Sequence, residues 1–530
     1  MRKTWILIMA LLMVMLCLPA EAEFHKTGYP IVDEPVTFTV MNPQASTGGP
    51  WGDNMVFFTA MKDLTGVDFT FSNTPQSDWA TKVNLALASG ELPDVFMSDV
   101  TADNIFVYGV QSGLFLDISD LIPEYMPNLM KMLDKYPDFL KVVTQTNGAI
   151  YSFPKLLRTA TSGTGIIYIN TDIMKAAGVE KLPSTLDEFY DTCMAIKEYK
   201  KDDPNFVTFV PQHVNAFNQH FELHMIGAFG DYVNAGFNDD GTGKVFYNGI
   251  TDQYKNYLAF VNKLYKDGII HPDMYSMDEA TALAMVKEGR CAITTIGTQM
   301  PIEQHEDGSY NVAVLPLFTS EYTDTLKVAS SNMISDSGIV ISAKCKNPEI
   351  LLRWFDIYYS EEDVAPGLNS VSPWLGVRGE TWDYTDETHQ YYHRPQPRDP
   401  EMNSTTYIQT YGAPQNYLGL DMTAIQQGGS FGNTVKGLGS VAYIYPYAVP
   451  QFPLNKNGPT TTNLLKFTEE EQEIYTNTMV DIDAYVDQMK AKFITGVEPI
   501  ENFDKYVETL KTMGLEKVLG VVQAAYDRYR

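Results

Sequence analysis

Between residues 36 and 97 the sequence alternates strand and helix patterns, and this alternation is the strongest constraint on the fold. Every second residue is apolar in Val36–Val40 and in Val67–Phe71, as expected of strands, and a third short strand is predicted at Asp94–Met97. Helical patterns near 54–64 and 77–88 separate the three strands. Strands joined in this way pack as a parallel sheet with right-handed crossovers, so an α/β domain is predicted.

A second set of α/β patterns follows downstream. Ile166–Ile169 is predicted to be a buried strand, and further strands are predicted at 292–296 and 312–315. A helix is predicted to begin after Thr185, because Glu188 stands three residues later and completes a capping box. A chain of 530 residues is too long for one hydrophobic core, so about two or three domains are expected.

The first residues have the pattern of an export signal. Basic residues at 2–3 precede an apolar run from Trp5 to Leu18, and the run is followed by small residues at positions 20 and 22. The run of about 14 apolar residues is shorter than the roughly 20 that a membrane span needs. We therefore predict a signal peptide over residues 1–22 and an extracellular or cell-surface protein, which would be periplasmic in a Gram-negative source.

Two alternatives to cleavage after residue 22 remain open. One is a retained membrane anchor. The other is lipid attachment through Cys17, which is disfavoured because Leu16 stands where a small residue normally precedes the lipid-bearing cysteine.

The formal net charge of −28 limits the partners of the chain. A surface this acidic repels phosphate backbones and anionic lipid. We expect no nucleic-acid partner, and we expect a monomer whose charge keeps it in solution.

The cysteines do not indicate a disulfide framework. After the leader the chain has Cys193, Cys291 and Cys345, an odd number of widely spaced residues in apolar surroundings. They are predicted to be small buried side chains.

Residues 367–459 are rich in Gly, Pro, Tyr and Asn and have no long periodic segment. Such a stretch is either a set of ordered binding loops or a flexible insertion, and its aromatic residues favour the ordered alternative. A capping box formed by Thr468 and Glu471 then starts the helices that close the chain.

Several stretches, taken in order along the chain, resemble the family 1 extracellular solute-binding proteins of bacterial ABC importers. They are WATKVNLALASGELPDV at 79–95, GLFLDI at 113–118, GAIYSFP at 148–154, YINTDI at 168–173 and PSTLDEF at 183–189. The stretches FITG at 493–496, YVETLKTMGL at 506–515 and AYDRY at 525–529 are similar to a subgroup of large Gram-positive lipoproteins associated with oligosaccharide uptake. One motif alone is weak, but the ordered set is specific and covers nearly the whole chain after the leader.

The resemblance implies a type II periplasmic-binding fold, in which two α/β lobes joined by a hinge close on a ligand in an interlobe cleft. We expect lobe 1 to comprise residues 23–156 and about 293–335, and lobe 2 to comprise 157–292 and about 336–530. The implied function is capture of a carbohydrate, expected to be an oligosaccharide, and its delivery to the membrane permease of an ABC importer.

Neither of two metal motifs is complete. Some members of the resembled family have a calcium loop where this chain has Lys200–Phe206, which lacks the alternating oxygen ligands and the central glycine. His220 and His224 flank Glu222, but a zincin has its glutamate directly after the first histidine. We expect no metal and no cofactor.

In an open α/β lobe, ligands meet the loops at the carboxyl ends of the strands. This rule selects polar and aromatic residues after the predicted strands, and the late aromatic stretch adds others. The predicted ligand-binding residues are Asn42, Gln44, Trp51, Ser98, Asp99, Lys155, Arg158, Thr298, Gln299, Trp374, Arg378 and Trp382.

These residue types suit a sugar, because indole rings stack on its apolar face while carboxylates, amides and guanidinium groups bond its hydroxyls. The alternative for each tryptophan is core packing, and the alternative for Asp99 and Arg158 is a solvated surface. Arg158 and Lys155 together could instead bind a uronate or a sulfate.

The sequence favours a receptor over an enzyme. It contains no glycine-rich phosphate loop, and no two carboxylates can be placed at the separation that glycoside cleavage requires. A sensory or adhesive sugar-binding module and a secreted glycoside hydrolase or lyase are the alternatives.

Overall fold

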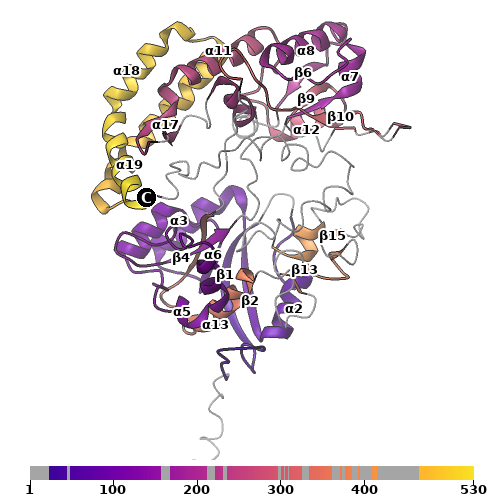
Figure 1. The fold of residues 1–530 in the computed structure, drawn as a ribbon. Helices are drawn as coiled ribbons and strands as arrows, with labels where there is room; N and C mark the ends of the chain where they lie inside the picture. Colours follow the sequence, from indigo (N-terminus) through magenta and orange to yellow (C-terminus); the bar gives the residue numbers. More distant parts are fainter. Residues whose placement is uncertain are drawn as a thin grey trace, which may run out of the picture. The chain divides into compact units, whose positions relative to one another are not determined.

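The computed structural model describes residues 23–44, 48–156, 167–211, 221–230, 236–240, 242–295, 300–301, 303, 305–307, 309–324, 334–360, 371–372, 376–384, 392–393, 407–414 and 465–530. The chain divides into two compact units (Figure 1). Unit 1 comprises Met1–Lys155, Asp336–Asp383 and Arg394–Met422, and unit 2 comprises Leu156–Ser335, Tyr384–His393 and Thr423–Arg530. The predicted signal peptide lies outside the described residues.

Unit 1 is built on a five-stranded sheet with the order β2-β1-β3-β11-β4. Its strands are β1 (Val36–Gln44), β2 (Val67–Pro75), β3 (Val95–Met97), β4 (Ser152–Leu156) and β11 (Ile334–Ile341). Strand β1 pairs in parallel with both β2 and β3, whereas β11 is antiparallel to β3. The predicted alternation of strands and helices up to residue 97 is confirmed.

Helices connect these strands and supply the apolar core of unit 1. They include α2 (Val56–Thr65), α3 (Trp79–Ser89), α5 (Ile122–Tyr125), α6 (Pro127–Lys135) and α13 (Pro348–Asp356). Helices α2 and α3 both end at glycines with left-handed backbones.

An aromatic cluster joins α2, β2 and α13. The ring centroid of Phe69 lies 6.2 Å from that of Phe58 and 4.8 Å from that of Trp354, and Phe57 lies 6.2 Å from Trp354. Edge-to-face contacts at these separations are favourable beyond the burial of apolar area. A helix from the C-terminal half of the chain is thereby fixed to the first crossover.

Unit 2 contains a four-stranded sheet with the order β10-β5-β9-β6. The strands are β5 (Tyr168–Asn170), β6 (Val207–Val210), β9 (Cys291–Thr294) and β10 (Val312–Val314). Strands β6 and β9 are parallel, and β5 is antiparallel to both β9 and β10. Unit 2 is therefore also an α/β unit.

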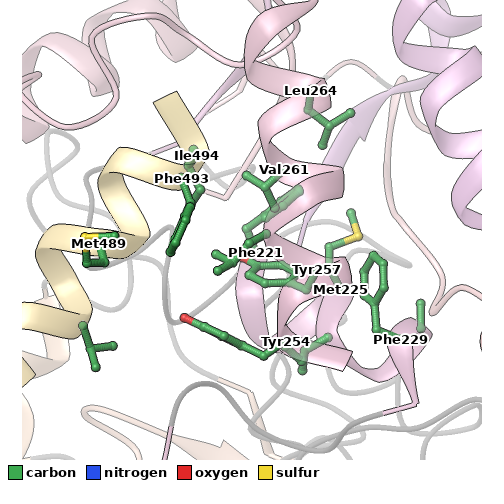
Figure 2. Packing of buried hydrophobic residues seen from close by; sticks show 14 of the residues in the cluster. Phe221, Met225, Phe229, Tyr254, Tyr257, Val261, Leu264, Met489, Phe493 and Ile494 are labelled. Atoms are coloured by element: carbon green, nitrogen blue, oxygen red, sulfur yellow. The ribbon is translucent and has the colours of Figure 1, made fainter. Parts of the chain in front are cut away.

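The helices of unit 2 include a long C-terminal group. They are α7 (Thr171–Ala176), α8 (Leu186–Tyr199), α11 (Asp252–Lys266), α12 (Glu279–Lys287), α17 (Glu469–Thr495), α18 (Phe503–Met513) and α19 (Leu515–Tyr529). Figure 2 shows apolar residues by which α11 and α17 pack, with Val261 and Tyr257 of α11 across from Phe493 of α17. Asn262 of α11 also donates to the carbonyl oxygen of Phe493 at 2.9 Å, so α11 caps the end of α17.

Two capping predictions have different outcomes. Thr468 and Glu471 form the complete capping box at the start of α17. At the start of α8, the Thr185 hydroxyl accepts from the Glu188 backbone N–H, but the Glu188 carboxylate accepts from Ser184, at 2.8 Å from its backbone nitrogen. The helix start is confirmed there, and the reciprocal bond is shifted by one residue.

Strand pairing corrects the expected division of the chain after residue 292. Strands β9 and β10 bond to β5, so the segment expected in lobe 1 from about 293 to 335 belongs to unit 2. Strand β11 bonds to β3, so the chain from Asp336 to Asp383 belongs to unit 1 rather than to lobe 2. The expected boundary at residues 156–157 lies one residue from the observed one.

The predicted burial of the three cysteines is confirmed, since Cys193, Cys291 and Cys345 are buried and unbridged. Burial raises the pKa of the Cys291 thiol to about 12. Within the described ranges, no helix combines the length and the apolar character that a membrane crossing requires.

Candidate functional site

The carboxyl edge of the unit 1 sheet gathers polar residues from several strands. Strands β1, β2 and β3 are parallel, so their carboxyl ends share one edge, and the antiparallel β11 begins there. This edge presents Asn42 and Gln44 of β1, Asn73 of β2, and Ser98 and Asp99 directly after β3. It is the position at which open α/β sheets bind ligands.

Asn42 and Asn73 form a hydrogen-bonded pair that holds the loop after β1. The Asn42 amide donates to Asn73 Oδ1 at 3.0 Å, and the Trp51 backbone N–H donates to the same oxygen at 2.7 Å. Asn73 Nδ2 in turn donates to the Trp51 carbonyl oxygen at 3.0 Å. Asn42 is fully buried, and its own Oδ1 has no hydrogen-bond partner among the described residues. These two side chains therefore position the loop.

Trp51 packs into the core of unit 1. Its side chain is 5% exposed, and its ring lies 6.0 Å from that of Phe58 and 6.2 Å from that of Phe71. In this conformation the indole supports the loop after β1 and offers little of its face to a ligand. Gln44 is half-buried, and its amide donates to the Gly48 carbonyl oxygen in the same loop at 3.4 Å.

Asp99 has an unusual backbone at the centre of the edge. Its φ of 53° makes it the one non-glycine residue in the described part of the chain with a left-handed backbone. The Trp79 indole donates to the Asp99 carbonyl oxygen at 3.2 Å, and the Asp99 N–H donates to the Ser337 carbonyl oxygen at 3.3 Å. Backbone strain of this kind is most common at binding sites.

The Asp99 side chain is exposed, whereas Ser98 beside it is buried. Surrounding protein nevertheless removes part of the hydration of the Asp99 carboxyl and raises its pKa, while the Ser98 hydrogen bond and the charge of Lys155 act in the opposite direction. The carboxylate is thus a solvent-facing acceptor with a hydroxyl and an ammonium group close by.

Strands β4 and β11 are tied together where the chain passes between its two units. The Ser152 hydroxyl donates to Asp336 Oδ2 at 2.8 Å, and the Ser337 hydroxyl donates to the Phe153 carbonyl oxygen at 2.7 Å. The Tyr359 hydroxyl donates to the Pro154 carbonyl oxygen at 2.7 Å. The unit boundaries after Lys155 and before Asp336 therefore lie in two bonded neighbouring strands.

The described part of the late aromatic stretch adds structural contacts in unit 1. Trp382 is 1% exposed, and its indole donates to the Gly376 carbonyl oxygen at 3.2 Å. Arg378 forms an ion pair with Asp383 at 2.8 Å. Trp382 therefore packs internally here, and the charge of Arg378 is already paired.

Four predicted ligand residues, Arg158, Thr298, Gln299 and Trp374, lie outside the described residues. The structure brings Asn42, Gln44, Ser98 and Asp99 to one edge of the sheet. Lys155 lies close enough to Asp99 for its charge to lower the pKa of that carboxyl. Sequence reasoning missed Asn73 and Asp336. Asn73 could have been found, because it follows the alternating pattern of the second strand.

The histidine motif is described only in part. His224 is buried, and its Nε2 lies 2.9 Å from the Pro316 carbonyl oxygen, while His220 lies outside the described residues. Among the residues that the structure describes, no three His, Cys, Asp or Glu side chains are grouped to hold a metal ion.

Comparisons with known proteins identify the family. The fructooligosaccharide ABC transporter substrate-binding protein FusA of Streptococcus pneumoniae is 25% identical over 493 residues, which cover 88% of this chain and 85% of the relative. A solved structure of the FusA EF-hand mutant in complex with fructo-nystose aligns with a TM-score of 0.75 at 22% identity, covering 93% of this chain and 99% of that one.

The alginate-binding protein AlgQ2, solved without calcium ion, aligns with a TM-score of 0.69 at 22% identity and covers 96% of this chain and 100% of that one. These likenesses confirm the expected two-lobed α/β fold. The family described as bacterial extracellular solute-binding protein matches residues 48–365. The chain belongs to this family of bacterial extracellular solute-binding proteins.

Proposed function

We propose that this protein is an exported receptor that binds a neutral oligosaccharide reversibly and delivers it to the permease of an ABC importer. The observation that carries the proposal is the similarity to FusA, a fructooligosaccharide-binding protein, over 88% of this chain. A relationship of that extent includes both units rather than a single motif.

The polar edge of unit 1 supports a ligand rich in hydroxyl groups. The Asp99 carboxylate accepts hydrogen bonds, and the nearby Lys155 ammonium group can donate them, while the buried Ser98 hydroxyl is bonded to the Asp99 carboxylate. A sugar hydroxyl both donates and accepts, so it can bond to groups of either kind. The Asp99 turn is held by hydrogen bonds to Trp79 and Ser337, so a ligand would not have to order it on binding.

The charges favour a neutral sugar over an acidic one. Lys155 lies close enough to Asp99 for its charge to lower the pKa of that carboxyl, and Arg378 is paired with Asp383. The net charge of −28 also repels a polyanion such as a uronate chain. Arg158, the remaining basic candidate, lies outside the described residues.

Binding without chemical change is the expected outcome for this chain. Its relatives are named as substrate-binding proteins, and one carboxylate at the edge, that of Asp336, has structural partners of its own. Asp336 accepts from the Ser152 hydroxyl and from the Gly338 backbone N–H. A carboxylate held in this way is poorly suited to act as a general acid or a nucleophile.

Export through the leader at residues 1–22 completes the proposal, with the mature protein released outside the cell or held at its surface. Mass spectrometry of the mature N-terminus distinguishes the two: a chain that begins at residue 23 is free, and one that begins with a lipid-modified Cys17 is anchored.

A calorimetric titration against a panel of ligands tests the substrate class. The panel contains kestose and a longer neutral fructooligosaccharide, an alginate oligosaccharide and a polar peptide. We expect saturable one-to-one binding of a neutral oligosaccharide and no measurable heat from the peptide. Tighter binding of the alginate oligosaccharide would overturn the assignment to neutral sugars, and binding of the peptide alone would overturn the carbohydrate class.

A further inference from the structure

The core of unit 2 contains an ion pair that the proposed function does not use. Glu222 lies in the short segment before α10 (Leu223–Met225), and its side chain is fully buried. Lys490 of α17 is 9% exposed, and its Nζ lies 3.2 Å from Glu222 Oε2. The second carboxylate oxygen, Oε1, has no hydrogen-bond partner among the described residues.

Four tyrosine hydroxyls near this carboxylate also lack partners in the described part of the chain. They belong to Tyr254, Tyr257, Tyr275 and Tyr506. Tyr254 and Tyr257 follow one another along α11, with ring centroids 5.9 Å apart. Figure 2 shows the Tyr257 ring beside Phe221, with Tyr254 and the α17 residue Phe493 nearby.

The four hydroxyls share the surroundings of Glu222. Burial raises the pKa of each of these tyrosines above its ordinary value, and the negative charge of Glu222 raises it further in all four. Geometry agrees: Tyr254, Tyr257 and Tyr506 pack in one buried cluster with Phe221, which precedes Glu222, and with Met489, which precedes Lys490. Tyr275 packs against the same cluster, so the groups come from α11, from α18 and from the loop after α11.

Groups of this kind are seldom left without a hydrogen bond. Buried polar atoms in native proteins are almost always bonded to protein or to ordered water. Glu222 Oε1 can only accept hydrogen bonds, whereas each tyrosine hydroxyl can donate and accept them. A water molecule between them can therefore donate to the carboxylate and also bond to the hydroxyls.

We propose that unit 2 encloses a water-binding site in which ordered water molecules bridge the Glu222 carboxylate to the tyrosine hydroxyls of α11, α18 and the loop after α11. Water fits better than a cation, because Lys490 already balances the charge of Glu222. A carbohydrate is excluded from this place by the apolar residues of the surrounding core, among them Met225, Val261 and Phe493.

A pair of matched variants tests the proposal through the sign of a stability change. Tyr257→Phe removes a hydroxyl that holds water in the proposed site. The control is Tyr358→Phe in unit 1, because the Tyr358 hydroxyl is equally buried and also lacks a partner among the described residues. No carboxylate acts on Tyr358 as Glu222 acts on Tyr257, so no charged acceptor would hold a water molecule there. A buried hydroxyl that has no hydrogen bond does not stabilise the fold, so replacing that tyrosine by phenylalanine should leave Tm unchanged or raise it.

We expect Tyr257→Phe to lower Tm and Tyr358→Phe to keep or raise it. An unchanged or raised Tm for Tyr257→Phe would overturn the water site. A high-resolution crystal structure of the wild-type chain decides the matter independently of folding yield. Water density in hydrogen-bond contact with Glu222 Oε1 and at least one of the four hydroxyls supports the site, and density showing these groups dry or bonded directly to protein overturns it.

Discussion

The backbone of Asp99 lies directly against Gly338. A Cβ at Gly338 would stand 2.8 Å from the Asp99 nitrogen and 2.6 Å from the Val100 nitrogen, and the Val100 N–H donates to the Gly338 carbonyl oxygen at 3.0 Å. Both residues have left-handed backbones, with φ of 53° and 65°. Strand β11 therefore holds the turn that presents the Asp99 carboxylate, and it does so through a residue that must lack a side chain.

Gly338→Ala should destabilise unit 1 more than the same change at a glycine of similar backbone. Gly113 is the control, because its φ is 63° and an added Cβ would meet nothing within 4 Å. Both variants incur left-handed strain, and only Gly338→Ala adds a steric clash with backbone atoms. We expect its loss to exceed that of Gly113→Ala by about 1–3 kcal/mol in urea unfolding. Equal losses would show that β11 does not press on the Asp99 turn.

Asp99→Asn should weaken oligosaccharide binding without loss of stability. Asparagine tolerates the left-handed backbone, so the turn is kept while the charged acceptor is lost. Hydrogen bonds to a charged group contribute more than neutral ones, and we expect Kd to rise about tenfold to a hundredfold by calorimetry. Asp63→Asn removes an exposed carboxylate from α2 and serves as the control, with Kd unchanged. The same Kd in all three proteins would remove Asp99 from the site.

Asp356 should make the stability of unit 1 fall as the pH rises. Its carboxylate accepts from the backbone N–H groups of Asn128 and Leu129 at the start of α6, at 3.0 and 2.9 Å from Oδ1. Burial nevertheless raises its pKa to about 6 against an ordinary value of 3.8. The folded state therefore binds the proton more tightly than the unfolded state, and the stability that this gives is complete below pH 4 and is lost as the pH rises through 6.

Asp356→Asn keeps an acceptor oxygen for the helix start and removes the titration. Relative to this variant, wild type should lose about 2–3 kcal/mol between pH 3.5 and pH 7.5. The measurement is denaturant unfolding of both proteins across that range. A difference that stays flat, or that favours wild type as the pH rises, would mean that the backbone N–H groups outweigh burial.

The Glu222–Lys490 pair should behave as a buried ion pair. Lys490→Met leaves the carboxylate buried and uncompensated, and we expect a loss of about 3–5 kcal/mol. Adding Glu222→Gln should recover part of this loss, because the uncompensated charge is then gone. Lys492→Met, two residues along α17 and only half-buried, is the control with little effect. Denaturant unfolding of the double-mutant cycle gives the coupling, and strict additivity of the two losses would contradict it.

Local pattern predicted the first crossovers because strand alternation and helical spacing are properties of neighbouring residues. Strand β11 was not predicted, because its place in the sheet depends on a distant partner. Its partner β3 lies more than two hundred residues earlier, and no pattern near Ile339 records that it pairs with Met97. The segments on either side of residue 335 were consequently exchanged between the two lobes.

The site shows the same limit. The rule that ligands meet strand ends led to Asn42, Ser98 and Asp99, because strand ends can be located from the sequence. Burial cannot be located in that way. Trp51 and Trp382 are aromatic residues of the kind that stack on sugars, yet both pack internally. Trp51 packs against the rings of Phe58 and Phe71, and the Trp382 indole is bonded to the Gly376 carbonyl oxygen. Ligand contact by any of these residues stays a prediction.

Recovery of the bound ligand is the most direct test of a receptor. Purified protein is incubated in turn with each neutral oligosaccharide of the panel and separated from free sugar, the complex is denatured, and the released sugar is identified by mass. We predict that a neutral oligosaccharide is recovered at one molecule per chain and is returned intact. Release of fructose or of any shortened product would contradict reversible capture, and so would the absence of bound sugar from the whole oligosaccharide panel.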